Sequence, residues 1–168
     1  MEIPFKNKEL GSDDTAAVAF QNSGQNRPKP VSRNDFRVFR EIQTRWSDND
    51  VYGHVNNVVY YSWFDTAVNG MLIEQGAIDI HAGTVIGLVV ETRCNYFAPL
   101  AFPENVVAGI RVAHVGSSSV RYEVGLFSDD AEQLCAAKGH FIHVYVDRVT
   151  RRPCALPQQL SALLETLK

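Results

Sequence analysis

The stretch from Asn56 to Gln75 most limits what this chain can fold into. It reads NNVVYYSWFDTAVNGMLIEQ, contains no proline, and distributes apolar side chains over nearly every side of a helix. A helix of this kind is buried on most sides rather than lying on a surface. It therefore needs a sheet curved around it, and Gly76 follows as a C-terminal stop.

Strands are predicted on both sides of this helix. Apolar residues between Phe36 and Trp46 are spaced by twos and fours, which indicates a first strand. After the helix, apolar and polar residues alternate in four segments, 85–90, 106–112, 120–126 and 142–146. Turns are expected at 98–103, 116–118 and 128–130, and the LSALLETL after Pro157 predicts a short closing helix. The pattern predicts an α+β domain, with a long central helix wrapped by a five-stranded antiparallel sheet whose last four strands form a meander.

Length and composition fit one such domain. The 168 residues are 45% apolar and 21% charged, enough to bury a single core. Residues 1–30 are polar and show no sustained period, so we expect an extension that is loosely ordered or packs on a partner. The domain proper is then expected over residues 31–168.

Several partner classes are disfavoured by composition. The net charge of −3 argues against nucleic acid, and no apolar run approaches the roughly 20 residues that span a bilayer. The N-terminal MEIPFKNKELGSDD lacks the apolar segment of a secretory signal. The three cysteines are widely spaced and suggest neither a disulfide framework nor a zinc motif. We expect a cytoplasmic protein without a metal and without membrane insertion.

Charge is unevenly distributed along the chain. No Lys or Arg occurs between Trp46 and Thr92, whereas this stretch contains six acidic residues. It therefore cannot hold an anion by ion pairing. Any phosphate-bearing ligand must rely on cations elsewhere, and Arg121 is a candidate because it follows a run of three serines.

The residues that point to chemistry lie just before the predicted helix. Asp50 is in a turn-rich loop that leads into the helix N-terminus, where amides without partners carry partial positive charge. A carboxylate beside such amides supplies a base or nucleophile together with oxyanion stabilisation, the two requirements of acyl hydrolysis. His54 and the amides of Asn56 and Asn57 could orient a water or a substrate carbonyl.

Each of these residues also has a purely structural explanation. A single Asp before a helix more often forms an Asx turn or a cap, and Asn56 or Asn57 could equally be a cap. A lone His is more often structural than catalytic. Two Asp, one His and two Asn within ten residues nevertheless exceed what a cap requires.

The run DNDVYGHVNNVVYYSWFD resembles the signature of hotdog-fold acyl-CoA thioesterases of the 4-hydroxybenzoyl-CoA thioesterase type, in which Asp-x-Asp-x-x-Gly precedes the long helix. The resemblance extends over about residues 36–158 and includes the segments NYFAPLAFPENV, GSSSVRYEV and VDRVTRRPCALP. It implies the hotdog fold and thioester hydrolysis.

The resemblance also implies roles for individual residues. The second Asp of the motif is Asp50, the expected catalytic carboxylate, while Asp48 is expected to bond the loop backbone. The HVNN run is similar to that of plant-type acyl carrier protein thioesterases, which places His54 and Asn57 near the thioester. One branch of the family has His where this chain has Asn57, so a mechanism that depends on that His is not expected here.

The sequence thus predicts hydrolysis of an acyl-CoA to free acid and CoA, with Asp50 as general base or nucleophile. The substrate carbonyl is expected near Val55 to Val58, with Tyr61 at the acyl group and Arg121 at a phosphate. No cofactor is expected, since CoA is part of the substrate. The family further implies a homodimer with one continuous sheet, paired again into a homotetramer, and a site built from two subunits.

Three alternatives remain at this stage. The first is a hotdog module that binds acyl-CoA without cleaving it. The second is an acyl carrier protein thioesterase. Hydration of an enoyl thioester ranks last, because the Asp and His pair expected of that branch is not apparent.

Overall fold

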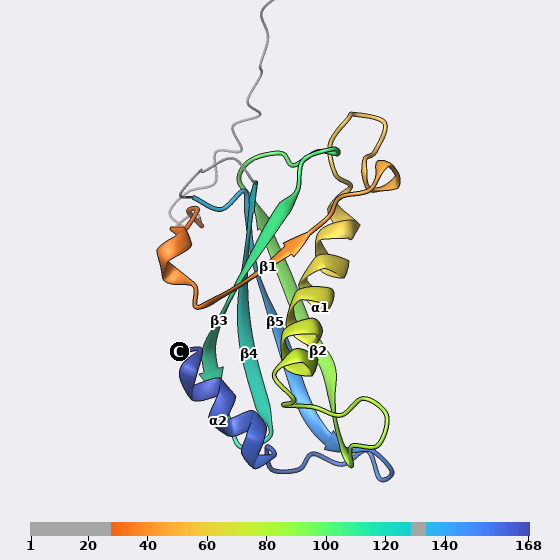
Figure 1. The fold of residues 1–168 in the computed structure, drawn as a ribbon, viewed down its shortest axis with the longest axis vertical. Helices are drawn as coiled ribbons and strands as arrows, with labels where there is room; N and C mark the ends of the chain where they lie inside the picture. The colour runs from red at the N-terminus through yellow and green to blue at the C-terminus, as the bar shows by residue number, and fades with distance from the viewer. Residues whose placement is uncertain (1–27, 129–133) are drawn as a thin grey trace, which may run out of the picture.

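The computed structural model describes residues 28–128 and 134–168, which form one antiparallel sheet with α1 on one face (Figure 1). The elements in chain order are the 3-10 turn η1 (Arg33–Asp35), β1 (Val38–Ile42), the 3-10 turn η2 (Trp46–Asp48), α1 (Asn57–Glu74), β2 (Val85–Tyr96), β3 (Val106–Val115), β4 (Ser119–Ser128), β5 (Ala137–Asp147) and α2 (Gln158–Thr166). The predicted α+β class with a five-stranded antiparallel sheet is confirmed.

The strands follow the order β1-β3-β4-β5-β2 across the sheet. β3, β4 and β5 form the expected meander, but β2 pairs with β5 rather than with β3, so the predicted four-strand meander is wrong at its first strand. Alternation shows that a segment is a strand and which face is buried, yet it does not show which strand lies beside it. β2 consequently lies at an edge of the sheet.

Helix and turn predictions were largely accurate. The helix predicted from Asn56 to Gln75 is α1, and the closing helix after Pro157 is α2. The turn predicted at 128–130 begins where β4 ends, but its last two residues lie outside the described residues, as do positions 1–27 of the predicted extension.

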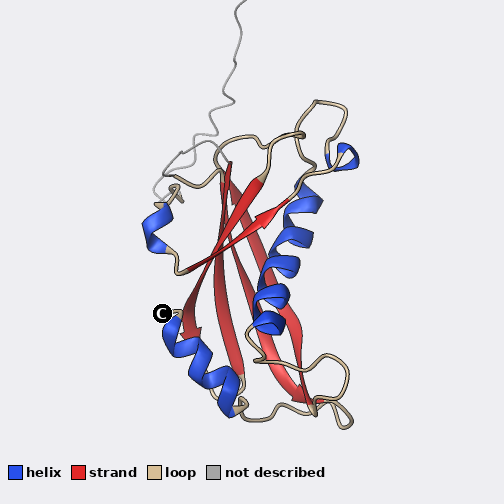
Figure 2. Ribbon diagram, in the orientation of Figure 1, coloured by secondary structure: helices blue, strands red, loops and turns tan. Residues whose placement is uncertain are grey.

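The core lies between α1 and the sheet (Figure 2). Phe64, Val68 and Leu72 of α1 are fully buried against inward-facing sheet residues such as Tyr122. Gly139 of β5 allows this close approach, because a Cβ there would overlap the Phe64 ring and the carbonyl oxygen of Arg93.

The outer side of α1 is uncovered within one chain. Seven of its 18 residues are buried, while Val58 and Ile73 are exposed. We expected a helix buried on most sides. Within one chain, α1 is buried only on the side that faces the sheet. α2 covers a different part of the core, where Leu160 and Leu164 are fully buried.

The α1 contact leads to a stability prediction. Gly139→Ala should lower the free energy of unfolding by about 2 kcal/mol, since the new methyl group must displace both an aromatic ring and a backbone carbonyl. Gly70→Ala is the matched control, because its Cβ meets only the flexible guanidinium of Arg40 and alanine favours the helix. Urea unfolding measures both variants, and equal stability of the two would show that the close approach at Gly139 is wrong.

Candidate active site at the start of α1

The loop before α1 is fixed by Asp48, whose side chain is 1% exposed. Its Oδ2 accepts the backbone N–H of Arg45 at 2.8 Å, and its Oδ1 accepts Nη2 of the same residue at 2.8 Å. The backbone carbonyl of Asp48 accepts the N–H of Asn56, also at 2.8 Å. Asp48 thereby ties the start of the loop to the residue at which the helix begins.

Asn56 is the N-cap of α1. Its side-chain oxygen accepts the N–H of Val58 at 3.1 Å, and the N–H of Val55 donates to the carbonyl of Leu100 at 2.8 Å. With the Asn56 N–H held by Asp48, three of the four amides in the predicted Val55–Val58 stretch are already used within the chain. Among the described residues, the N–H of Asn57 alone in this stretch lacks an acceptor, at the positive end of the helix.

Asp50 lies in the same loop and forms an Asx turn. Its Oδ1 accepts the N–H of Tyr52 at 2.8 Å, and its own N–H donates to the carbonyl of His54 at 2.8 Å. Gly53, at φ +84°, supplies the left-handed backbone that closes the turn. The second carboxylate oxygen of Asp50 makes no hydrogen bond within residues 28–128 and 134–168, so the turn leaves it available to a ligand.

The loop before α1 lies at one end of that helix (Figure 1). Asp50 and His54 belong to this loop, and Asn57 is the first residue of α1. The His54 side chain is exposed, and only its backbone carbonyl bonds the loop. No hydrogen bond links its ring to Asp50 in the described part of the chain.

Tyr96, at the end of β2, touches the helix start directly. Its hydroxyl donates to the carbonyl of Asn57 at 3.2 Å, and its ring packs edge-on against Tyr60 at a centroid distance of 5.0 Å. Burial, together with the nearby Cys94 and Tyr61, raises the pKa of Tyr96, so the phenol stays a neutral donor. The sequence gives no indication of the bond between Tyr96 and Asn57, because these residues are 39 positions apart.

Cys94 is the thiol of this region, and it is poorly suited to be a nucleophile. Burial raises the pKa of Cys94 to about 11, so the reactive thiolate is scarce at neutral pH. A carboxylate is therefore the better nucleophile or base at this end of the helix.

Arg121 lies on the other face of the sheet. Its neighbours Val120 and Tyr122 point into the core beside α1, whereas the Arg121 guanidinium contacts Nδ1 of His140 at 2.9 Å. Nε2 of that histidine contacts the Glu91 carboxylate at 2.6 Å. Within one chain, the structure does not bring Arg121 together with Asp50.

The surroundings of Asp50 are unusually apolar for an exposed loop. Trp46, Val51 and Tyr52 are all more than three-quarters exposed. Several large exposed apolar side chains in one loop indicate a surface that a ligand or another chain covers.

The described residues contain no group of three or more His, Cys, Asp or Glu side chains arranged to hold a metal ion. Within the same part of the chain, no helix has both the length and the apolar character needed to cross a membrane.

Comparison with known proteins identifies the family. The profile of the thioesterase-like superfamily matches residues 44–164. The chain belongs to this superfamily, and the class of enzyme that the superfamily defines is the thioester hydrolase.

Three solved structures illustrate the similarity. The PA5185 protein of Pseudomonas aeruginosa is 51% identical, with a TM-score of 0.80, and the match covers 83% of this chain and 97% of that one. A 1,4-dihydroxy-2-naphthoyl-CoA thioesterase from Synechocystis is 18% identical over 75% of this chain and 93% of its own, with a TM-score of 0.67. The gentisyl-coenzyme A thioesterase BH1999 is 22% identical over 76% and 99%, with a TM-score of 0.66. The last two share the fold.

A curated relative, the uncharacterized protein YsmA of Bacillus subtilis, is 24% identical over 88 residues. The match covers 52% of this chain and 59% of that protein.

The Asp48 contacts lead to a second stability prediction. Asp48→Ala should lower the free energy of unfolding by about 2 kcal/mol, because the buried loop loses a charged acceptor for several donors. Asp50→Ala, which removes the acceptor of a single exposed N–H, should cost less than about 1 kcal/mol. Thermal or urea unfolding compares the two, and a larger loss in Asp50→Ala would contradict this division of roles.

Proposed function

We propose that the protein hydrolyses an acyl-CoA thioester to the free acid and CoA, with Asp50 as general base or nucleophile. The proposal depends chiefly on one juxtaposition at the start of α1. A carboxylate oxygen and a helix-terminal N–H lie there, and neither has a partner among residues 28–128 and 134–168. These two groups are the Asp50 Oδ2 and the Asn57 amide.

The chemistry follows from these positions. The thioester carbonyl points at the Asn57 N–H, where the helix dipole stabilises negative charge on the oxygen. In the general-base route, Asp50 takes a proton from water, the water oxygen bonds the acyl carbon, and the C–S bond breaks as the proton passes to the leaving thiolate. In the nucleophilic route, Asp50 forms a mixed anhydride that water then hydrolyses. His54 is assigned to orienting the substrate or the water.

Coenzyme A is the proposed carrier because two structural neighbours are named as CoA thioesterases. Its phosphates need cations. None occurs from Trp46 to the end of α1, and Arg45 just before this stretch is paired with Asp48. A hollow on the outer face of the sheet, of about 250 Å³, contains Lys29, Arg93, Arg121 and Lys138 in its lining. Glu123 also lines it and pairs with Lys138 at 3.1 Å. We assign the phosphates to this face, which requires either that the carrier wraps around the sheet or that a neighbouring subunit supplies the cations.

A second copy of the chain is proposed to complete the site. β2 is an edge strand of 12 residues, and its Leu88, Val89 and Val90 are exposed. A long apolar edge favours pairing with another strand. Antiparallel pairing of β2 with its own copy would form one continuous sheet and cover the exposed side of α1. A further pairing of such dimers into a tetramer is part of the proposal.

The catalytic assignment predicts a large effect of Asp50→Asn. The amide can neither accept the proton nor attack, so kcat should fall by a factor on the order of 10² or more. Glu165→Gln, which changes an exposed carboxylate on α2 that pairs with Lys168, is the matched control and should retain activity. Thiol release measured by a chromogenic disulfide reagent decides the matter, and near wild-type turnover in Asp50→Asn would reject Asp50.

The dimer predicts an effect of charge at the β2 edge. Val90 is 59% exposed, and Val90→Lys should leave the protein monomeric at micromolar concentration because an edge lysine opposes strand pairing. Val149→Lys, at a position that is 87% exposed in a turn, should leave the assembly unchanged. Sedimentation velocity measures both variants, and a monomeric wild-type protein would refute the proposed assembly.

A further inference from the structure

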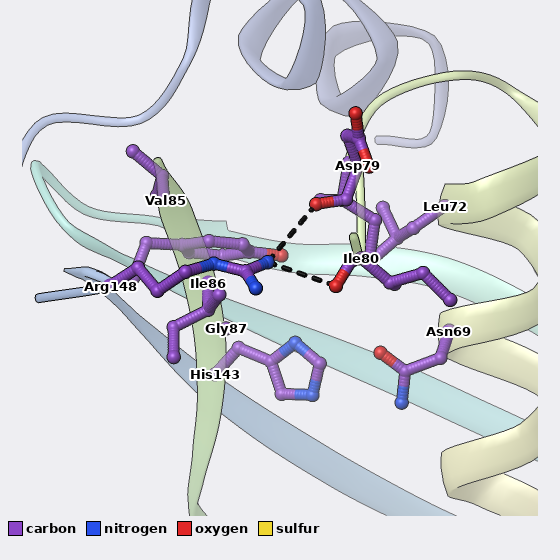
Figure 3. A pocket seen from close by; sticks show the side chains of 11 residues that line it. Asn69, Leu72, Asp79, Ile80, Val85, Ile86, Gly87, His143 and Arg148 are labelled. Carbon is purple, nitrogen blue, oxygen red and sulfur yellow. Dashed lines mark hydrogen bonds between the residues drawn. The ribbon is translucent and has the colours of Figure 1, made fainter. Parts of the chain in front are cut away.

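A cavity lies at the opposite end of α1 from Asp50. It measures about 140 Å³, is open on one side, and is lined by the last turns of α1, the loop at 75–84, the start of β2 and the end of β5 (Figure 3). Asn69 is twelve residues along the helix from Asn57, which corresponds to about 18 Å. A cavity of this volume accommodates a group about the size of a benzene ring.

His143 is the unusual residue of this cavity. It is 1% exposed, and within the described chain neither of its ring nitrogens has a hydrogen-bonding partner. Its neighbours on the inner face of the sheet are the rings of Phe141, Tyr145 and Tyr122, at centroid distances of 5.1, 5.9 and 5.5 Å. A buried polar group without a partner is costly, so its retention here indicates that something else binds it.

The cavity is shaped around this histidine. Gly87 lies opposite the ring, and a Cβ there would come within 3.0 Å of Nδ1 and within 3.2 Å of a Tyr145 ring carbon. From the other wall, Asn69 of α1 faces the ring across the cavity (Figure 3). Because Gly87 has no side chain and Asn69 has a short one, the His143 ring faces the cavity.

Arg148 fixes the loop at 75–84, which forms one wall of the cavity. Its guanidinium donates to the backbone carbonyls of Asp79 and Ile80 at 3.3 and 3.0 Å, which ties the loop after α1 to the end of β5. Its Nε is also buried and has no acceptor among the described residues. Two unpartnered polar groups therefore belong to residues lining a cavity whose remaining walls are mostly apolar, including Leu72, Ile78 and Val85. Asp79 also lines the cavity, and its carboxylate accepts the backbone N–H groups of His81 and Ala82.

These groups indicate the chemistry of an occupant. Burial lowers the pKa of His143 to about 4, so the ring is neutral at physiological pH and offers one donor and one acceptor. A hydroxyl can satisfy either nitrogen because it both donates and accepts. A charged group would lose its hydration in an aliphatic cavity without gaining a free counter-ion, since Arg148 is already engaged.

We propose that this cavity binds a compact neutral group bearing a hydroxyl, and that His143 hydrogen-bonds that hydroxyl. The occupant is the far end of the acyl group, a step that rests on the proposed function and dimer. Two-fold pairing through β2 reverses the second chain, so the C-terminal half of one α1 lies beside the N-terminal half of the other. Each cavity then adjoins the Asp50 loop of the partner subunit, and His143 is a specificity residue for a thioester cleaved there.

The first test is binding without catalysis. Phenol and benzene share a ring that fits the cavity and differ by one hydroxyl, so phenol should bind the full-length protein about tenfold more tightly. Long-range ¹H–¹⁵N spectra of the histidine rings should show the His143 nitrogens shifting with phenol. In His143→Phe the preference for phenol should disappear, whereas His114→Phe, at an exposed position, should retain it. Gly87→Ala should weaken both probes by filling the space beside the ring.

Equal affinity of phenol and benzene, no binding of either, or a phenol preference that survives in His143→Phe would each overturn the proposal. If His143→Phe fails to fold, Gly87→Ala decides, and undiminished phenol binding in that variant overturns it.

The second test concerns the substrate. The ratio of kcat/KM for 4-hydroxyphenylacetyl-CoA to that for phenylacetyl-CoA should exceed about ten in the wild-type protein and fall to about one in His143→Phe. A ratio unchanged by His143→Phe, with both thioesters cleaved, removes the acyl assignment and leaves the proposed function intact. If the wild-type protein cleaves no acyl-CoA, the proposed function and the acyl assignment fail together, and the phenol experiment still judges the cavity.

Discussion

The rest of the site depends on the hydrogen bonds that the buried Asp48 makes within the loop before α1. The carboxylate accepts hydrogen bonds from the backbone N–H and the guanidinium of Arg45. The backbone carbonyl of Asp48 accepts the N–H of Asn56. This fixes Asn56 as the cap, and the cap in turn determines which amide is left without a partner. The Asp50 turn follows directly on this anchor, so the orientation of its free oxygen is set by the same network. An ion pair with one exposed partner, such as Arg45, stabilises the fold little by itself. Here the pair fixes the conformation of the loop that leads into α1.

The second constraint is that one chain leaves its own surfaces unfinished. β2 has a free edge, α1 has an uncovered side, and the loop around Asp50 exposes several large apolar residues. The ribbons of β2, α1 and the loop before α1 lie on the same side of the view in Figure 1, and the proposed two-fold partner would cover them together. In the proposed dimer, the Asp50 end of one protomer lies beside the His143 end of the other.

Periodicity was sufficient to predict the elements but not their neighbours. The apolar stretch before Gly76 and the alternating segments correspond to α1 and to the strands, because each pattern reports burial along one element. The pairing of β2 with β5 was missed because it depends on how the loop after β2 directs the chain. The candidate carboxylate was found through the Asp-x-Asp-x-x-Gly pattern, whereas the free amide of Asn57 was not distinguished from its neighbours. Which amide is free depends on partners such as Leu100, 45 positions away from Val55. His143 falls at an inward position between Phe141 and Tyr145, a signal that alternation alone could have revealed.

The central claim is that this fold and this helix terminus cleave thioesters rather than merely bind them. Its most direct test is release of free thiol from a panel of acyl-CoAs by the wild-type protein, followed alongside binding of the same compounds. We expect catalytic release from at least one member of the panel, with many turnovers per protomer. Tight binding of acyl-CoA without release from any member would contradict it and would identify the chain as a binding module.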